Sequence, residues 1–421
     1  MLPHAQPKPK EHPVGVEHPR HIIFPFDIHR DPSEFNAENR KSIYRIFPEI
    51  EVLAFDKHFL LLCMRTLPPK PWPRTIAGVP AYFTTDQADE GPIAPIKRFG
   101  SSRIRLHGDL DCRHDPAQRR QVFELIRRYF SEVSIEITEI QYWRNFVVVV
   151  LENDETDLTA VPRAVASCPC YYLFESEMGR PKDFPSLHIK KSGVDSIYDD
   201  SEYTVLRPGV MLSSGKDELK GHEVLTTAGV FVKDKDGNEY MTVTSHSFPH
   251  GSRVFHPHTG GREIGEIVME LPSTDVALVK LHDGERFTNK LFESSHMLKP
   301  PPSLKVFIHT SEITPGDLVF MDTPFTGYEE GTANVAAATR VRRIPTDDSH
   351  EPAMEWMDTR WDYMGQGSVR TFVDGACGSV IWNEEGNVVG FFRYGPVSGH
   401  FVDWCQSVSA DHLIDWGLTV I

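Results

Sequence analysis

Residues 221–421 contain many short apolar runs separated by tight turns, and this pattern constrains the fold more than any other feature. Turns are marked by the sequences Asp-Lys-Asp-Gly-Asn at 234–238 and Glu-Glu-Gly-Asn at 384–387. Strands are expected at residues 226–232, 240–244, 276–281, 305–309, 318–321, 333–343, 379–382, 388–393 and 401–406. Short strands at this spacing, without interleaved helical patterns, predict an all-β barrel or sandwich. A closing helix is expected at residues 410–416.

The first half of the chain mixes helical and strand patterns. Residues 115–131 are expected to form an amphipathic helix, because one apolar stripe repeats every four positions at Val122, Ile126 and Phe130. Strands are expected at 134–140 and 145–151, the second with an unbroken valine run typical of a strand buried on both faces. Residues 41–190 are therefore predicted to form a small α+β domain, whose role the sequence does not indicate.

Two segments are predicted to lie outside the folded domains. Residues 1–40 begin with a stretch rich in proline and histidine, which predicts a flexible tail. Residues 191–220 are acidic and rich in turn formers, which predicts a linker between the α+β domain and the β-rich domain.

The charge balance excludes several classes of partner. The chain has 60 Asp and Glu against 44 Lys and Arg, a formal net charge of −16. Nucleic-acid binding and docking on anionic membranes both depend on clustered Lys and Arg, so neither partner is expected. No apolar run approaches the roughly 18 residues that span a bilayer. Because the N-terminus also lacks the apolar segment of a secretory signal, a cytoplasmic or nuclear protein is expected.

The cysteine pattern predicts free thiols. The six cysteines are Cys63, Cys112, Cys168, Cys170, Cys377 and Cys405, and their spacing does not indicate a disulfide framework. A redox or metal pair at Cys168-Pro-Cys170 is the alternative, but no second Cys/His pair with zinc spacing accompanies it. Free cysteines leave one of them available for nucleophilic chemistry.

Three short motifs in the second half carry residue types suited to catalysis. The first is Thr-Ser-His at 244–246, which follows an expected strand. The second is Ser-Thr-Asp-Val-Ala-Leu-Val-Lys-Leu at 273–281, with Asp275 just before an apolar strand, and the third is Gly-Ala-Cys-Gly-Ser at 375–379. Each motif alone has a structural explanation as a strand end or tight turn. Their order, histidine then aspartate then nucleophile, is what indicates a shared site.

With these motifs, residues 206–421 resemble the chymotrypsin-like peptidases. The segment around Cys377 resembles the Gly-x-Ser-Gly motif and following hairpin of the high-temperature-requirement serine proteases, with a cysteine at the serine position as in the picornaviral cysteine proteases. The Asp275 strand is similar to that family's Asp-Ile-Ala-Leu strand. The segment also resembles uncharacterised intracellular trypsin-like proteins of filamentous fungi. The resemblance implies a chymotrypsin-like double β-barrel at residues 221–421.

The resemblance assigns roles that the chemistry of the side chains can fill. Cys377 is the expected nucleophile, His246 its base, and Asp275 the group that fixes the tautomer of the imidazole. The backbone amides of Gly375 and Cys377 are expected to form an oxyanion hole, and Gly378 lets the chain leave the turn without a side-chain clash.

Substrate specificity is less well indicated. Thr371, Phe391 and Phe392 are candidates for an apolar substrate pocket, while a plain core role for the two phenylalanines is an equal alternative. The strand after the nucleophile has no histidine of the kind found in glutamate- and glutamine-cleaving relatives. Residues 322–364 exceed a standard connection and are expected to contain an insertion near the site, acting as a lid or partner surface.

A zinc site is the rival interpretation of one loop. His246, His250, His256 and His258 lie close together in sequence, yet no cysteine or glutamate has a matching offset. We therefore expect no metal and no cofactor.

The sequence leaves two functions open. The leading hypothesis is a cysteine-type endopeptidase that hydrolyses protein or peptide substrates through a thioester at Cys377. The alternative is a catalytically inactive pseudo-protease that acts as a peptide-binding or scaffolding module. The natural substrate and the oligomeric state are not indicated.

Overall fold

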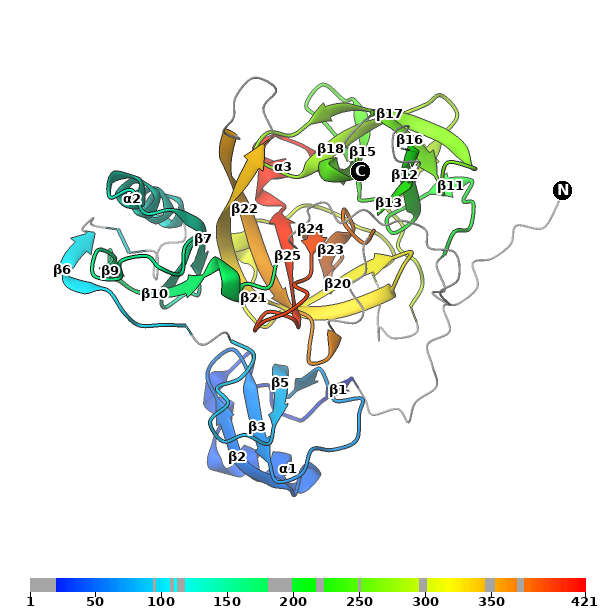
Figure 1. Cartoon of the computed structure of the whole chain (residues 1–421). Coiled ribbons are helices and arrows are strands. Elements are labelled where there is room, and N and C mark those ends of the chain that lie inside the picture. Colours follow the sequence, from blue (N-terminus) through cyan, green and yellow to red (C-terminus); the bar gives the residue numbers. More distant parts are fainter. Residues whose placement is uncertain are drawn as a thin grey trace.

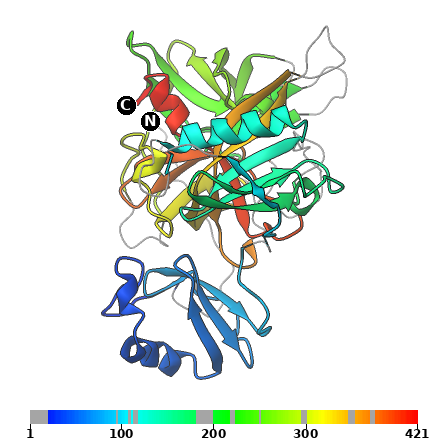
Figure 2. The ribbon, with the colours of Figure 1, turned by 90° about the vertical axis from the view of Figure 1, so that its left-hand side faces the viewer.

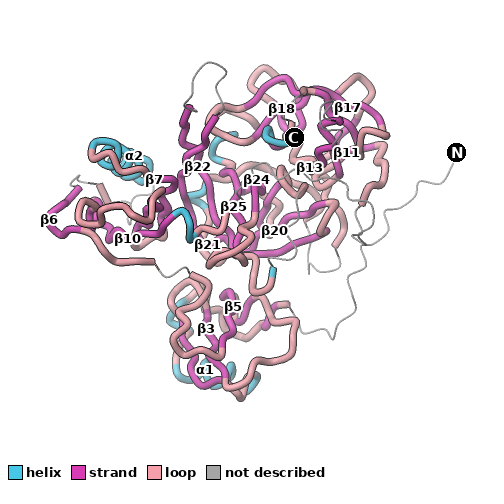
Figure 3. Tube along the Cα trace, in the orientation of Figure 1, coloured by secondary structure: helices cyan, strands magenta, loops and turns pink. Residues whose placement is uncertain are grey.

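The computed structural model describes residues 20–93, 96–106, 110–111, 118–180, 199–216, 223–248, 251–294, 301–344, 353–368 and 375–421. Strands dominate these residues and helices are few and short (Figure 3), as the sequence predicted for the second half of the chain. No helix among these residues has the length and apolar character to cross a membrane.

One 8-stranded sheet carries the first two sequence motifs, and Figure 1 shows its strands at the upper right. The strand order is β13-β12-β16-β17-β18-β15-β14-β26. The bounds are β12 Met211–Lys216, β13 Glu223–Thr227, β14 Phe231–Lys233, β15 Glu239–Thr244, β16 Arg253–His256, β17 Arg262–Glu270, β18 Val276–Leu281 and β26 Thr419–Val420. Alternate residues of these strands point into one apolar core, which includes Met241, Val243, Ala277 and Val279.

A second, 11-stranded sheet carries the cysteine motif. Its first six strands run in the order β20-β23-β24-β25-β22-β21, and β20 also pairs with β21, so these six strands close on themselves. Their bounds are β20 Leu318–Thr323, β21 Gly327–Ile344, β22 Ala353–Tyr363, β23 Val380–Asn383, β24 Val388–Tyr394 and β25 Trp404–Ser409. The short helix α3 (Asp411–Asp415) follows directly on β25, where the sequence predicted a closing helix.

The remaining strands of this sheet come from the first half of the chain. Strand β21 pairs with β7, and the sheet continues through β8, β10, β9 and β6. The bounds are β6 Ser101–Leu106, β7 Ile137–Tyr142, β8 Val147–Leu151, β9 Pro162–Val165 and β10 Cys168–Phe174. Helix α2 (Arg119–Glu132) crosses one face of these strands (Figure 2) and buries its apolar stripe there. Strand β8 is fully buried, as its valine run predicted.

Buried charged side chains connect strands β6 to β10 with the closed set of strands β20 to β25. Arg180 forms ion pairs with Glu139 on β7 and with Glu175. Glu139 also accepts a hydrogen bond from the indole Nε1 of Trp361 on β22 at 2.6 Å. Such a cluster is stable only because each charge has a partner of opposite sign or a hydrogen bond.

The N-terminal part forms a separate sheet of five strands, drawn in blue at the bottom of Figures 1 and 2. The order is β1-β4-β5-β3-β2, and helix α1 (Ala37–Ile46) adds Ile43 to the core. The bounds are β1 His21–Ile22, β2 Ile50–Phe55, β3 Leu60–Met64, β4 Thr75–Ile76 and β5 Val79–Thr84. This unit contacts the larger body at Gln366, whose side-chain amide bonds both the backbone N–H and C=O of Phe83 at 2.7 and 2.8 Å.

The domain boundaries of the structure differ from the predicted ones. Residues 20–40 of the expected tail contain β1 and the start of α1, because Asn36 caps the helix and β1 pairs with β4; residues 1–19 lie outside the described part. The range 41–190 contributes to two different sheets. The expected linker 191–220 contains β12 and the short β11 (Val205–Leu206), which pairs with β19 (Arg286–Phe287).

The structure also differs from the predictions for residues 322–364 and 305–309. In the range 322–364, where the sequence predicted a lid or partner surface, the described residues form the long β21 and β22, which pair with β7 and β25. The strand expected at 305–309 is absent, and Phe307 makes only one isolated bridge with Val388.

Candidate active site

His246 lies at the end of β15, in a single 3₁₀ turn formed by Ser245–Ser247. The strand end places the imidazole at the border of the 8-stranded sheet, where 11% of the side chain remains exposed. The ring Nδ1 contacts Asp275 Oδ2 at 2.6 Å and Thr244 Oγ1 at 2.8 Å. Besides these contacts, a hydrogen bond between the His246 side chain and Cys377 contributes to its electrostatics.

Asp275 precedes β18, the neighbour of β15 in the sheet. Because Val276 pairs with Thr244, the residues just outside the pair, Ser245 and Asp275, lie side by side. The backbone N–H of Ser245 donates to the Asp275 carbonyl at 2.9 Å. Asp275 Oδ1 accepts from the Ser245 hydroxyl at 3.0 Å and from the His246 backbone N–H at 3.2 Å. The Asp275 side chain is 1% exposed, so these bonds replace the hydration of its carboxylate.

Cys377 lies in a turn of the second sheet just before β23. Gly375 and Gly378 flank it with φ of 98° and 86°, the left-handed region that glycine tolerates best. A Cβ on Gly375 would lie 2.6 Å from the ring of Phe325, so a side chain at this position is excluded by space as well. The glycines predicted from the motif are therefore required by the geometry of the turn.

Two consecutive threonines of β13 hold this turn from the other sheet. Thr227 Oγ1 donates to the Gly375 carbonyl at 2.8 Å, and Thr226 Oγ1 donates to the Cys377 carbonyl at 2.9 Å. Each carbonyl shares a peptide plane with the next N–H, so these bonds fix the planes that lead into Ala376 and Gly378 and hold the turn on both sides of Cys377. The amide N–H groups of Gly375 and Cys377 have no hydrogen-bond acceptor among the described residues.

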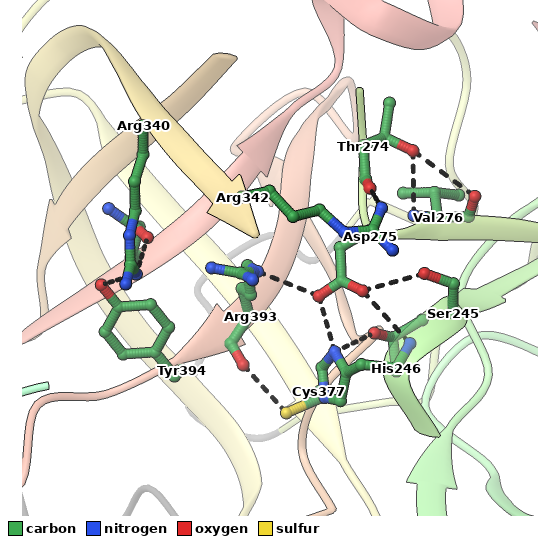
Figure 4. A network of polar contacts seen from close by, with 12 residues as sticks. Ser245, His246, Thr274, Asp275, Val276, Arg340, Arg342, Cys377, Arg393 and Tyr394 are labelled. Carbon is green, nitrogen blue, oxygen red and sulfur yellow. Dashed lines mark hydrogen bonds and ion pairs between the residues drawn. The ribbon is translucent and has the colours of Figure 1, made fainter. Parts of the chain in front are cut away.

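His246, Asp275 and Cys377 meet at the border of the two sheets (Figure 4). Burial by itself lowers the pKa of His246, but the charges of Asp275 and Cys377, and hydrogen bonds to both, raise it to about 9. Burial alone raises the pKa of Asp275, but the imidazolium of His246 and the nearby guanidinium groups of Arg393 and Arg342 hold it well below its ordinary value. The arrangement favours a charged imidazolium facing a charged carboxylate.

Arg393, at the end of β24, belongs to this site although the sequence analysis did not single it out. Its Nε donates to Asp275 Oδ2 at 2.9 Å, and its backbone carbonyl accepts the Cys377 S–H at 2.9 Å. No sequence signal distinguishes Arg393 from the other arginines, because 118 residues separate it from Asp275.

Two of the three candidate pocket residues are buried in the structure. Phe391 and Phe392 are each 3% exposed and pack in the core between the sheets, which is the alternative that the sequence left open. Thr371 lies outside the described residues.

The described histidines do not form a metal site. His256 is fully buried, its Nδ1 bonds the Met211 carbonyl at 2.7 Å, and its Nε2 accepts the Tyr203 backbone N–H at 2.9 Å. Both nitrogens are thus engaged within the protein. His250 lies outside the described residues, and across the described ranges no cluster of three or more His, Cys, Asp or Glu has metal-binding geometry.

No known family model matches this sequence, and no curated protein matches it. Among solved structures, the chain is similar to a glutamic-acid-specific serine protease with a histidine triad in substrate binding, with 13% identity, 51% of this chain and 100% of that chain covered, and a TM-score of 0.34. It is also similar to a Nocardiopsis protease (15% identity, 51% and 98% covered, TM-score 0.34) and to Thermobifida fusca protease A (12% identity, 52% and 98% covered, TM-score 0.33).

Proposed function

We propose that this protein is a cysteine-type endopeptidase of chymotrypsin-like fold that acts on peptides or proteins. Cys377 is the nucleophile, His246 the base and Asp275 the residue that orients the imidazole. The observation that carries the proposal is the 2.6 Å contact between His246 Nδ1 and Asp275 Oδ2 beside Cys377, whose charge and hydrogen bond contribute to the raised pKa of His246.

The sheet arrangement supports a double-barrel assignment. The strands β20 to β25 close on themselves, and β12, β13 and β15 to β18 form the antiparallel strands of the other body. His246 and Asp275 come from one body and Cys377 from the other, so a peptide bound at the seam would contact groups from both.

The groups support acyl transfer in two steps. In the reactive form the Cys377 proton is already on His246 Nε2, as a thiolate–imidazolium pair; Sγ attacks the peptide carbonyl carbon, and the negative charge that develops on oxygen is stabilised by the Gly375 and Cys377 amides. His246 then gives the proton to the departing amine as the C–N bond breaks, which leaves a thioester. A water molecule that loses a proton to His246 hydrolyses the thioester and restores the thiol.

One contact favours the second candidate, a pseudo-protease that binds peptides without cleaving them. The Cys377 S–H donates to the Arg393 carbonyl at 2.9 Å, which directs the thiol proton to a backbone acceptor. If this contact persists with a peptide bound, no thiolate forms and only binding remains.

The rate of Cys377 alkylation by iodoacetamide at pH 6.5, followed by residue-specific mass spectrometry, distinguishes the two. An ordinary thiol with a pKa of about 8.5 is only about 1% ionised at this pH, so an activated Cys377 reacts about 10²-fold faster. We expect this advantage to be lost in His246→Ala and kept in His282→Ala, a matched control at an exposed histidine that contacts Glu263.

An ordinary alkylation rate for Cys377 in all three proteins would contradict the peptidase. Cys405 serves as an internal reference, because it is fully buried and reacts only when the protein unfolds. A fast Cys377 in a protein whose Cys405 stays unmodified therefore reports an activated thiol in the folded state.

A further inference from the structure

Arg393 contacts both the acidic and the nucleophilic member of the proposed triad. Its Nε bonds Asp275 Oδ2 at 2.9 Å, the same oxygen that His246 Nδ1 contacts at 2.6 Å, and its carbonyl receives the Cys377 S–H. The Arg393 side chain is 9% exposed and the Asp275 side chain 1% exposed, so solvent screens their interaction weakly. A guanidinium at this place therefore acts directly on the carboxylate that controls the imidazole.

The position of Arg393 is fixed by its neighbours on β24. The preceding residue, Phe392, is buried in the core and exchanges backbone hydrogen bonds with Gly378 and Ser379 at 2.9 and 2.8 Å. The following residue, Tyr394, has its hydroxyl bound by Arg340 at 2.7 Å and by Arg180 at 2.9 Å. The strand end is thus anchored on both sides, and the guanidinium is not a mobile surface group (Figure 4).

We propose that Arg393 is a positioning residue whose guanidinium offsets the negative charge of Asp275 and so limits how tightly His246 holds its proton. This inference rests on the proposed peptidase function, because it concerns the same three side chains. A carboxylate alone in a buried site stabilises the imidazolium strongly, and an imidazolium that is too stable is a weak acid toward the departing amine. A cation that shares Oδ2 withdraws part of that stabilisation, so His246 can both accept and return the proton.

The other charged groups near the proposed triad affect His246 in different ways from Arg393. Arg342, on β21, bonds the Thr274 carbonyl and pairs with Glu270 and Glu355; its charge also lowers the pKa of Asp275, but by less than that of Arg393. Around His246 itself, Asp275 and Cys377 are the groups whose charge raises its pKa. Arg393 is the cation in direct contact with the Asp275 oxygen that orients the ring.

The test measures the pKa of His246 by NMR of labelled imidazole in a Cys377→Ala background, with the signal assigned from a His246→Gln variant. Removing the charge in Arg393→Gln is expected to raise the pKa of His246 by about one unit. Arg393→Lys, which keeps the charge, is expected to shift it by less than half as much. The comparison variant Arg342→Gln removes a guanidinium that also acts on Asp275 but more weakly, and is expected to shift it by less than half as much.

A lowered or unchanged His246 pKa in Arg393→Gln would overturn the proposal, and so would equal shifts in the glutamine and lysine variants. If the glutamine variant does not fold, the lysine variant still decides, because a fall in the His246 pKa there contradicts the proposal and a small rise supports it. The Cys377→Ala background has no nucleophile, so the outcome is independent of peptidase activity. Failure of the peptidase itself appears separately, as an ordinary alkylation rate of Cys377 in the protein with native Arg393.

Discussion

His246 and His256 both belong to the 8-stranded sheet and its turns, and both are shielded from solvent. Their pKa values are nevertheless shifted in opposite directions. His256 bonds a backbone carbonyl and a backbone N–H, and burial lowers its pKa to about 4. His246 bonds the carboxylate of Asp275, and although burial lowers its pKa too, the charges of Asp275 and Cys377 raise it to about 9. The chemical nature of the partner, and not burial, therefore decides which histidine carries a proton at neutral pH.

The same contrast separates a structural histidine from the histidine proposed as the base. Both ring nitrogens of His256 are used to tie the segment around Tyr203 to β12, so neither can exchange a proton with a ligand. His246 uses Nδ1 to contact its carboxylate and keeps Nε2 on the side of Cys377. A perturbed pKa indicates a functional site only together with such a chemically reactive neighbour.

The substitution Asp275→Asn is expected to have the largest effect, because it gives His246 a neutral partner like that of His256. Without the carboxylate, burial lowers the pKa of His246 below 6.5, and Cys377 loses its charged neighbour. We expect alkylation of Cys377 at pH 6.5 to slow by about 10²-fold, and turnover of any peptide substrate to fall by about 10⁴-fold. Alkylation rates measured by mass spectrometry check the first effect.

The substitution also leaves Arg393 without its buried acceptor, so stability must be followed in the same samples. Protection of Cys405 against alkylation reports the folded fraction, since that thiol is fully buried. An alkylation rate of Cys377 that stays high while Cys405 remains protected would mean that the carboxylate does not control the imidazole.

The sequence predicted the members of this site because strand ends are locally encoded. The motifs at 244–246 and 273–281 lie at the ends of two strands that pair directly, but the prediction that His246 and Asp275 share a site came from the order of the motifs and the resemblance to chymotrypsin-like peptidases. The glycine pair around Cys377 marked a turn with left-handed backbone, which the structure contains. The catalytic roles of these residues remain predictions that the experiments above test.

Strand pairings between distant parts of the sequence could not be predicted from local motifs. The pairing of Ala337 with Tyr142 joins the first half of the chain to the second sheet, and no local pattern specifies which edge a strand will choose. The fully buried valines of β8 did signal a strand covered on both faces, but not its partner. Strand β12 was missed because its Ser213, Ser214 and Gly215 are residues typical of turns.

The substitution His256→Gln tests whether the lowered pKa of His256 reduces the stability of the protein at acid pH. Because the folded-state pKa of His256 is about 4 and the unfolded value about 6.5, the unfolded chain binds more protons between these pH values. The free energy of unfolding therefore falls as the pH drops from 6.5 to 4, by about 2–3 kcal/mol from this residue. Urea unfolding at several pH values should show a shallower fall in the glutamine variant. Equal pH slopes in both proteins would exclude a neutral, buried His256.

The substitution His246→Gln tests whether the raised pKa of His246 stabilises the protein at neutral pH and ceases to do so at alkaline pH. The folded-state pKa of His246 is raised to about 9, so its contribution to stability is present below pH 6.5 and is lost as the pH rises through 9. We expect a difference of about 2–3 kcal/mol between the two ends of this range, similar to that for His256 because the two pKa shifts have the same size. The free energy of unfolding in urea is measured for the native protein and the variant at each pH. The difference between the two proteins reports His246 alone, because other groups that titrate between pH 6.5 and 9 contribute equally to both. A native protein that gains stability relative to the variant above pH 9 would contradict the charged imidazolium.

The smallest effect is expected for Thr244→Val. The Thr244 hydroxyl contacts His246 Nδ1 at 2.8 Å, beside the 2.6 Å contact with Asp275, so it is a second and neutral partner of the same nitrogen. Removing it should destabilise the protein by about 1 kcal/mol, the ordinary net value of one hydrogen bond, and shift the pKa of His246 by less than half a unit. NMR titration of His246 measures this shift. A fall of a full unit would assign control of the imidazole to the hydroxyl, and the difference between His246 and His256 would then no longer rest on the carboxylate.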